Sequence, residues 1–197
     1  MVNQGAFRKI LFQQFGPRNA EAILASQRKR LIQLHRGRTK YADRALRAHL
    51  NGNILPGLSL YQALCDRGVD QTEALRVTKV ALEESVHLRR RLMSWLGRLR
   101  IAFPVLRSMI RKTMQNDYPP EGWETRWVEV SSKLVAFDIQ RCFYLDTLTA
   151  YGAPELTACF CALDDLLYQD LWPDVKWGRT MTLGRGDPVC NFRYKKS

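Results

Sequence analysis

Several signals typical of membrane and secreted proteins are absent from this 197-residue sequence. No apolar run approaches the roughly 18 residues that a membrane-spanning helix needs. The N-terminal stretch MVNQGAFRKILFQQFG has no continuous apolar core and no small-residue cleavage site, so it does not resemble a secretory signal. Because 46% of the residues are apolar, as in ordinary globular proteins, we expect a compact fold. Because membrane and secretory signals are absent, the expected location is the cytoplasm.

The motifs of several enzyme classes are also missing. The sequence contains no G-x-S-x-G, no Walker-type phosphate loop, no H-E-x-x-H and no G-x-G-x-x-G. Only three histidines occur, and all lie in the N-terminal half. We therefore expect no cofactor.

Cysteine is present, but in a pattern that does not suggest disulfides or a zinc site. An odd count of five without a secretory signal favours free thiols. The closest pair, Cys159 and Cys161, would point about 200° apart on a helix and could not easily hold one ion. The remaining cysteines are Cys65, Cys142 and Cys190.

Positive charge is in large excess, with a formal net charge of +12. Such an excess fits a small anionic substrate, an anionic membrane surface, nucleic acid or a solvated helix face. The basic residues are not interleaved with a stacking platform of aromatics, so no nucleic-acid binding is expected. Peripheral membrane contact and the oligomeric state stay open. The two basic clusters are Arg28, Lys29, Arg30, Arg36, Arg38, Lys40, Arg44 and Arg47, and Arg89, Arg90, Arg91, Arg98, Arg100, Arg107, Arg111 and Lys112.

Helical spacing dominates the first 117 residues. It predicts a helix over residues 18–35 after Pro17, an interruption at NGNILPGLSLYQAL and a further helix that Gly68 ends. The longest pattern runs to Phe103, where Pro104 should stop it. Its apolar face would cover a sheet, or alternatively lie on an anionic membrane. This face comprises Leu88, Leu92, Trp95, Leu96, Leu99 and Phe103.

The pattern changes at NDYPPEGW, so we expect a helical region over residues 1–117 and an α+β region over residues 118–197, together one compact domain. TRWVEVSSKLVAFDIQRCFY predicts one strand or two short ones, and APELTACFCALDDLLYQDLW a helix. VKWGRTMTL and VCNFRYKK predict a hairpin around GRGDP. The expected fold class is α+β, with a mainly helical N-terminal half packed on a C-terminal antiparallel sheet.

The candidate site residues come from the last helix and the hairpin. On the helix, Asp164 and Asp165 lie one turn after Cys161, and Tyr168 lies two turns after it, so all could share one face. The alternative is that the two aspartates point to solvent. On the last strand Cys190 shares a face with Phe192 and Tyr194, while Asn191 and Arg193 share the opposite face.

A four-residue loop in the hairpin would place Met181 opposite Cys190 and Arg179 opposite Phe192. A guanidinium at that position would lower the pKa of the Cys190 thiol, or bind a substrate carboxylate.

Three segments resemble the L-2-amino-thiazoline-4-carboxylic acid hydrolase family: NILPGLSLYQAL, RCFYLDTLTAYGAPELTACFCALDDLLY and GRTMTLGRGDPVCNFRYKK. The family's tail reads R-T-x-T-(L/I)-x-x-G-x-x-x-C-D-F-R-(F/Y), after a helix bearing C-x-x-D. This sequence departs from the tail at Asn191, where the family usually has aspartate. Either that position is catalytic and its chemistry has changed, or it only caps the hairpin.

The resemblance implies a hydrolase that adds water at C2 of a 2-aminothiazoline ring and releases an N-carbamoyl-cysteine. It offers Cys190 as nucleophile, or Asp164 or Asp165 as the group that activates water, with Cys161 nearby. Arg179, or secondarily Arg193, would bind the substrate carboxylate, and Tyr144 and Asn191 are further substrate-binding candidates. Two alternatives stay open: a metal held by Cys142, Cys161 and Cys190, and a binding protein for an acidic small molecule.

Overall fold

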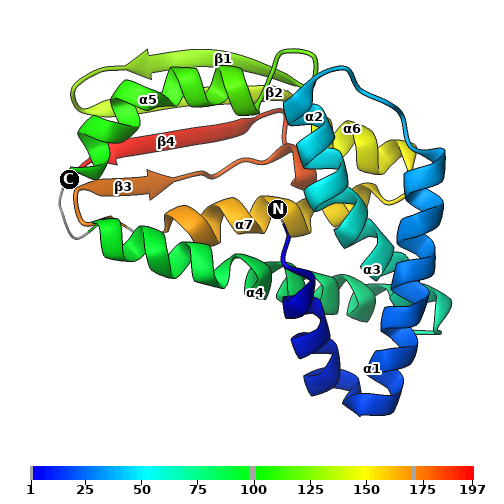
Figure 1. The fold of residues 1–197 in the computed structure, drawn as a ribbon. Coiled ribbons are helices and arrows are strands. Elements are labelled where there is room, and N and C mark those ends of the chain that lie inside the picture. Colours follow the sequence, from blue (N-terminus) through cyan, green and yellow to red (C-terminus); the bar gives the residue numbers. More distant parts are fainter. Residues whose placement is uncertain (1, 98–100, 170–171) are drawn as a thin grey trace. The chain divides into compact units, whose positions relative to one another are not determined.

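The computed structural model describes residues 2–97, 101–169 and 172–197 (Figure 1). The chain forms two compact units, Met1–His87 and Leu88–Ser197. The first is helical, and the second combines helices with a four-stranded antiparallel sheet, so the predicted α+β class is confirmed. The predicted regions 1–117 and 118–197 divide the chain by composition, and that division stays a prediction.

The first unit is built around helix α1 (Gln4–Gly37). Asn3 caps it by accepting a hydrogen bond from Gly5 N at 2.9 Å. Gly16 interrupts the helical backbone with φ of 72°, which suits glycine, and Pro17 then begins the second segment of α1, as predicted.

The predicted interruption at NGNILPGLSLYQAL was wrong. Helix α2 (Arg44–His49) continues through a π-helical turn (Leu50–Ile54) into α3 (Leu55–Asp66). Pro56 is tolerated because it lies in the first turn of α3, where its missing N–H needs no partner. Gly68 ends this element with φ of 79°, as predicted.

Helix α4 (Gln71–Gly97) and helix α5 (Ala102–Asp117) replace the single long helix that we expected. Phe103 and Pro104 belong to the first turn of α5 and do not end α4. Pro104 is again at a position without an intrahelical N–H bond, and Phe103 N donates to Asp174 Oδ2 at 3.0 Å.

Of the residues predicted to form the apolar face of that helix, the structure describes the burial of only two, and they differ. Phe103 is buried, but Leu88 is 77% exposed. Of the other predicted members, Leu92, Trp95, Leu96 and Leu99 lie outside the described side chains. Among the described residues, no helix is both long enough and apolar enough to cross a membrane.

The sheet has the strand order β1-β2-β4-β3 (Figure 1). The segment predicted as one strand or two forms two, β1 (Trp123–Val130) and β2 (Leu134–Cys142), joined as a hairpin. Between β2 and the last hairpin the chain forms α6 (Phe143–Ala150), a short 3-10 turn (Pro154–Leu156) and α7 (Thr157–Tyr168).

The predicted hairpin pairs β3 (Val175–Gly178) with β4 (Cys190–Lys196). Its register is the predicted one, since Trp177 lies opposite Tyr194 and Gly178 opposite Arg193. The predicted four-residue loop was wrong, because the ladder ends at Gly178 and residues 179–189 form a longer loop with a 3-10 turn (Leu183–Arg185). The expected pairs Met181–Cys190 and Arg179–Phe192 are therefore not part of the β3–β4 ladder. This loop follows directly after the strand and carries Arg179.

Candidate active site

Arg179 joins the loop to helix α7. Its Nη1 donates to Asp164 Oδ2 at 3.0 Å, and its Nη2 donates to Asp165 Oδ2 at 2.8 Å and to the Cys161 carbonyl at 2.7 Å. The guanidinium stacks near Phe192, with 5.2 Å from Cζ to the ring centroid. Helical spacing therefore brings Cys161, Asp164 and Asp165 to one guanidinium, as the sequence suggested.

The two aspartates are held differently. Both oxygens of Asp165 accept hydrogen bonds, one from Arg179 and one from Trp177 Nε1 at 3.2 Å. Arg179 reaches only Oδ2 of Asp164. The side chain of Arg179 is 1% exposed whereas that of Asp164 is 36% exposed, so about a third of the Asp164 side chain reaches the surface while protein surrounds the rest.

Asp164 also has an unusual acidity. Desolvation by the surrounding protein raises its pKa to about 6, and the charge of Asp165 adds to the increase, although Arg179 opposes it. A carboxyl group with this pKa exchanges protons near neutral pH, as a general acid–base catalyst must.

The thiols near this cluster are protonated at neutral pH. Burial raises the pKa of Cys190 to about 11 and that of Cys161 to about 12. Arg179 does lower the pKa of Cys190, as expected, but burial outweighs it. Cys190 is buried, with 5% of the residue exposed, and its sulfur accepts a hydrogen bond from Leu183 N at 3.2 Å.

Cys142, at the end of β2, belongs to the same neighbourhood, since its charge raises the pKa of both other thiols. Burial raises the pKa of Cys142 as well. Within the described part of the chain, no group of three or more His, Cys, Asp or Glu side chains is placed to hold a metal ion. The metal alternative therefore gains no support from the geometry.

Gly184 lets the loop pack closely against α7. A Cβ at this position would lie 2.9 Å from Cys161 Sγ, 3.0 Å from Thr157 Cγ2 and 3.2 Å from Ala158 N. Real Cβ atoms essentially never make a contact as short as the first, and the other two are tighter than most, so a side chain here would displace Cys161 or its neighbours. The GRG segment is thus more than a turn: its first glycine brings the loop onto the first turns of α7.

Three buried polar atoms around this loop have no hydrogen-bond partner in the described structure: Arg179 Nε, Thr157 Oγ1 and Thr182 Oγ1. Buried polar atoms are normally paired, so these three are exceptions beside one loop. Sequence reasoning missed both threonines. Thr182 occupies the second threonine of the R-T-x-T motif, which was the available signal.

A group of tyrosines surrounds Asp164. Burial raises the pKa of Tyr118, Tyr168 and Tyr194, and the charge of Asp164 contributes to each increase. Tyr168 was expected here from helical spacing. Tyr144, predicted to bind substrate, packs on Phe160 with ring centroids 5.1 Å apart.

Two predicted residues lie elsewhere. Arg193 is on the face of β4 opposite Cys190, where it donates to Asp138 Oδ1 at 2.7 Å and to the carbonyls of Phe137 and Phe192. Asp138 is buried, also binds Arg126 at 2.7 Å, and was not anticipated from the sequence. The structure thus does not bring Arg193 together with the thiols.

The side chain of Asn191 is hydrogen-bonded to the loop that follows β3. Its Oδ1 accepts from Thr180 N at 2.9 Å and Met181 N at 2.8 Å, and its Nδ2 donates to Thr180 Oγ1 at 2.8 Å. These bonds extend the hairpin beyond its last paired residue. Of the two roles that the sequence left open, the geometry fits the cap.

The second unit thus brings a carboxylate pair, a buried guanidinium and thiols together. The family model described as L-2-amino-thiazoline-4-carboxylic acid hydrolase matches residues 47–194, which is most of the chain. The chain belongs to this family. No curated protein and no solved structure shows a significant match.

Proposed function

We propose that this protein hydrolyses a cyclic amidine or thiazoline carboxylate, such as L-2-amino-thiazoline-4-carboxylate, to an N-carbamoyl-cysteine. Membership of the family supports the hydrolase class. The observation that carries the proposal is Asp164, a solvent-accessible carboxylate whose pKa is raised to about 6 beside a buried guanidinium.

In the proposed reaction the ionised Asp164 takes a proton from water as the water oxygen bonds to C2 of the ring. The C2–S bond then breaks, and Asp164 returns its proton to the leaving sulfur, which becomes the product thiol. The second proton of the water ends on the ring nitrogen, which becomes an amide N–H. A group with a pKa near 6 can serve as base and then as acid in each of these two proton transfers, the one to sulfur and the one to the ring nitrogen.

Asp165 and Arg179 position this group. Arg179 keeps a positive charge in the site because the two carboxylates raise its pKa more than burial lowers it. Its Nη atoms are occupied by the protein, so we assign to the substrate carboxylate the unpaired Arg179 Nε and the hydroxyls of Thr157 and Thr182. This changes the expected contact from the bidentate end of Arg179 to its Nε.

The thiols line the site in this mechanism. Attack by Cys190 would first require removal of a proton whose pKa is about 11, whereas Asp164 is already ionised at pH 7. We therefore expect Cys190→Ser to retain turnover within about tenfold of the wild type. A loss of about 100-fold or more in a folded variant would instead assign the nucleophile to Cys190.

The test of the reaction is incubation of the purified protein with L-2-amino-thiazoline-4-carboxylate, with release of free thiol followed over time. The D enantiomer is the control, since the carboxylate contacts should distinguish the two. Turnover of the L form supports the proposal. If the folded protein binds this compound without turnover, the chain is a binding protein for acidic small molecules; if it neither binds nor turns it over, this substrate class is wrong.

A further inference from the structure

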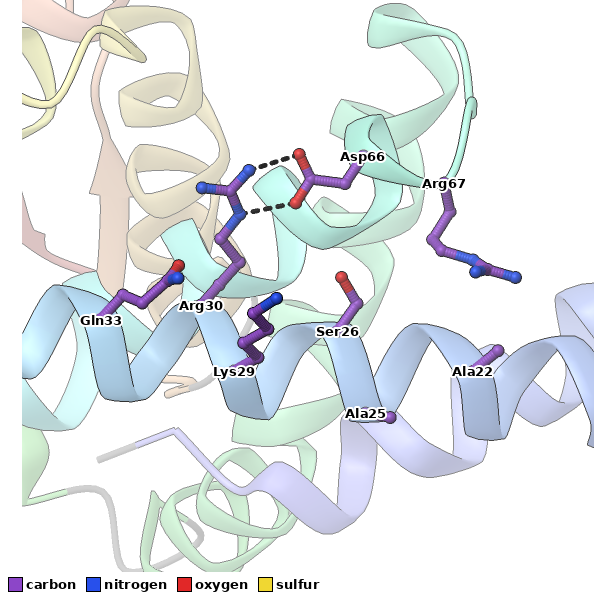
Figure 2. A pocket seen from close by; sticks show the side chains of 8 residues that line it. All are labelled: Ala22, Ala25, Ser26, Lys29, Arg30, Gln33, Asp66 and Arg67. Carbon is purple, nitrogen blue, oxygen red and sulfur yellow. Dashed lines mark hydrogen bonds and ion pairs between the residues drawn. The ribbon is translucent and has the colours of Figure 1, made fainter.

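A cavity of about 560 Å³ lies in the first unit, between α1 and the end of α3 (Figure 2). None of the residues that line it belongs to the α7 and hairpin cluster. Its lining therefore shares no residue with the proposed hydrolase site. The lining side chains Lys29, Gln33, Asp66 and Arg67 are exposed, so this is a hollow open to solvent, with a volume within the range of small-molecule sites.

Positive charge dominates the cavity lining. Arg30 and Asp66 form a two-bond ion pair, with both N–O distances at 2.6 Å, and so neutralise each other. Lys29 and Arg67 also line the cavity, and within the described part of the chain neither makes an ion pair with a carboxylate. Arg30 and, less strongly, Lys29 lower the pKa of the Asp66 carboxyl, so Asp66 offsets part of both charges. Three cations against one carboxylate still leave an excess of two positive charges at one concave surface.

The other lining groups suit an oxyanion with a small organic body. Ser26 points from α1 into the space that Lys29 and Arg67 flank in the view of Figure 2, and it offers a hydroxyl. Ala22 and Ala25 give α1 a low surface at this point, so a ligand can approach the helix closely. Gln33 adds an amide at the other end of the lining.

The nearby end of α3 does not oppose an anion strongly. A helix C-terminus carries partial negative charge on its free carbonyls. Here the Leu64 carbonyl accepts hydrogen bonds from Arg67 N at 3.1 Å and Val69 N at 3.1 Å, and the Cys65 carbonyl accepts from Gly68 N at 2.9 Å. The turn at Gly68 thus satisfies these carbonyls internally.

We propose that this cavity binds a small organic dianion through Lys29 and Arg67. The chemistry fits a phosphomonoester, whose charge at pH 7 is between about −1.5 and −2. It also fits a dicarboxylate, because arginine and lysine recognise both oxyanions. The site is separate from the hydrolase chemistry and holds whether or not that assignment is correct.

The test is isothermal titration calorimetry of the full chain with ribose 5-phosphate, succinate and inorganic phosphate. The double variant Lys29→Ala/Arg67→Ala should weaken binding at least about tenfold, since charge-assisted hydrogen bonds are the strong ones. The matched control is Lys40→Ala, which removes an exposed cation of the same basic cluster that does not line the cavity; it should bind as the wild type does.

Ribose 5-phosphate and succinate show whether the hollow prefers a phosphomonoester or a dicarboxylate. Tighter binding of either than of inorganic phosphate indicates that the organic part of the ligand is also recognised. Equal weakening in the control variant would reduce the effect to general electrostatics and overturn the site. Absence of binding by all three probes would overturn it as well. Because all three substituted side chains are on the surface, circular dichroism should show unchanged folding.

Discussion

At the scale of single residues, Asp164 makes the site sensitive to pH. Its pKa of about 6 belongs to a group that must be ionised to accept a proton from water. We therefore predict that kcat/KM for the thiazoline substrate rises with pH through a limb whose midpoint is near 6 and then levels off. A pH–rate profile measured between pH 4.5 and 8 checks this. A profile without a rise centred near pH 6 would contradict it.

Asn191 provides a second test at the residue scale. We predict that Asn191→Asp keeps activity and stability, because a carboxylate accepts the same hydrogen bonds from Thr180 N and Met181 N. Asn191→Ala should lower the free energy of unfolding by about 0.5–1.5 kcal/mol, since two backbone donors, one exposed and one part-buried, exchange their acceptor for water. Urea unfolding of both variants measures the difference. A gain of activity of at least tenfold in the aspartate variant would show a catalytic role instead.

At the scale of secondary-structure elements, the close contact between the loop and α7 depends on Gly184. Gly184→Ala should destabilise the protein by about 1–3 kcal/mol, because its Cβ would overlap Cys161 Sγ and Thr157. It should also reduce turnover by shifting the loop that carries Arg179.

Gly178→Ala is the matched control in the same hairpin. Its added Cβ would lie 3.9 Å from Arg193 Cβ, an ordinary contact, so stability should change by no more than about 0.5 kcal/mol. Thermal unfolding and turnover of both variants compare the two positions. Equal behaviour of the two variants would show that the packing at Gly184 does not matter.

The elements also show which features the sequence could predict. Helical spacing alone indicated that Cys161, Asp164 and Asp165 share a face. The assumed hairpin loop gave the right offset between β3 and β4 but the wrong loop length, so the pairs it named lie beyond the end of the ladder. The π-helical turn was not predictable, because Gly52 and Pro56 usually interrupt helices and only their exact placement makes them tolerable. The expectation that Pro104 ends the long helix was wrong for the same reason, because Pro104 lies in the first turn of α5.

Electrostatic outcomes were harder to predict than positions. The sequence placed an arginine near a cysteine and so suggested a lowered thiol pKa. The opposite results because burial, which depends on the packing of the whole unit, exceeds the effect of one guanidinium. The pairing of Arg193 with Asp138 could not be foreseen either, since their contact depends on the pairing of β2 with β4.

At the scale of the whole molecule, catalysis and stability make opposite demands on Asp164. Its pKa is higher in the folded chain than the ordinary value of 3.8, so ionisation disfavours the folded state. The stability associated with the protonated form is present below about pH 4 and is lost as the pH rises through about 6. The Asp164→Asn variant carries an uncharged amide at this position, so its free energy of unfolding would not fall in this way as the pH rises.

The most direct measurement is therefore a paired one on Asp164→Asn and the wild type: kcat/KM for L-2-amino-thiazoline-4-carboxylate at pH 7.5, with the free energy of unfolding from pH 4 to 8. We predict a loss of activity of at least about 100-fold, and a stability difference that shifts in favour of the variant as the pH rises. A folded variant with nearly wild-type turnover would contradict the assignment of Asp164 as the catalytic base.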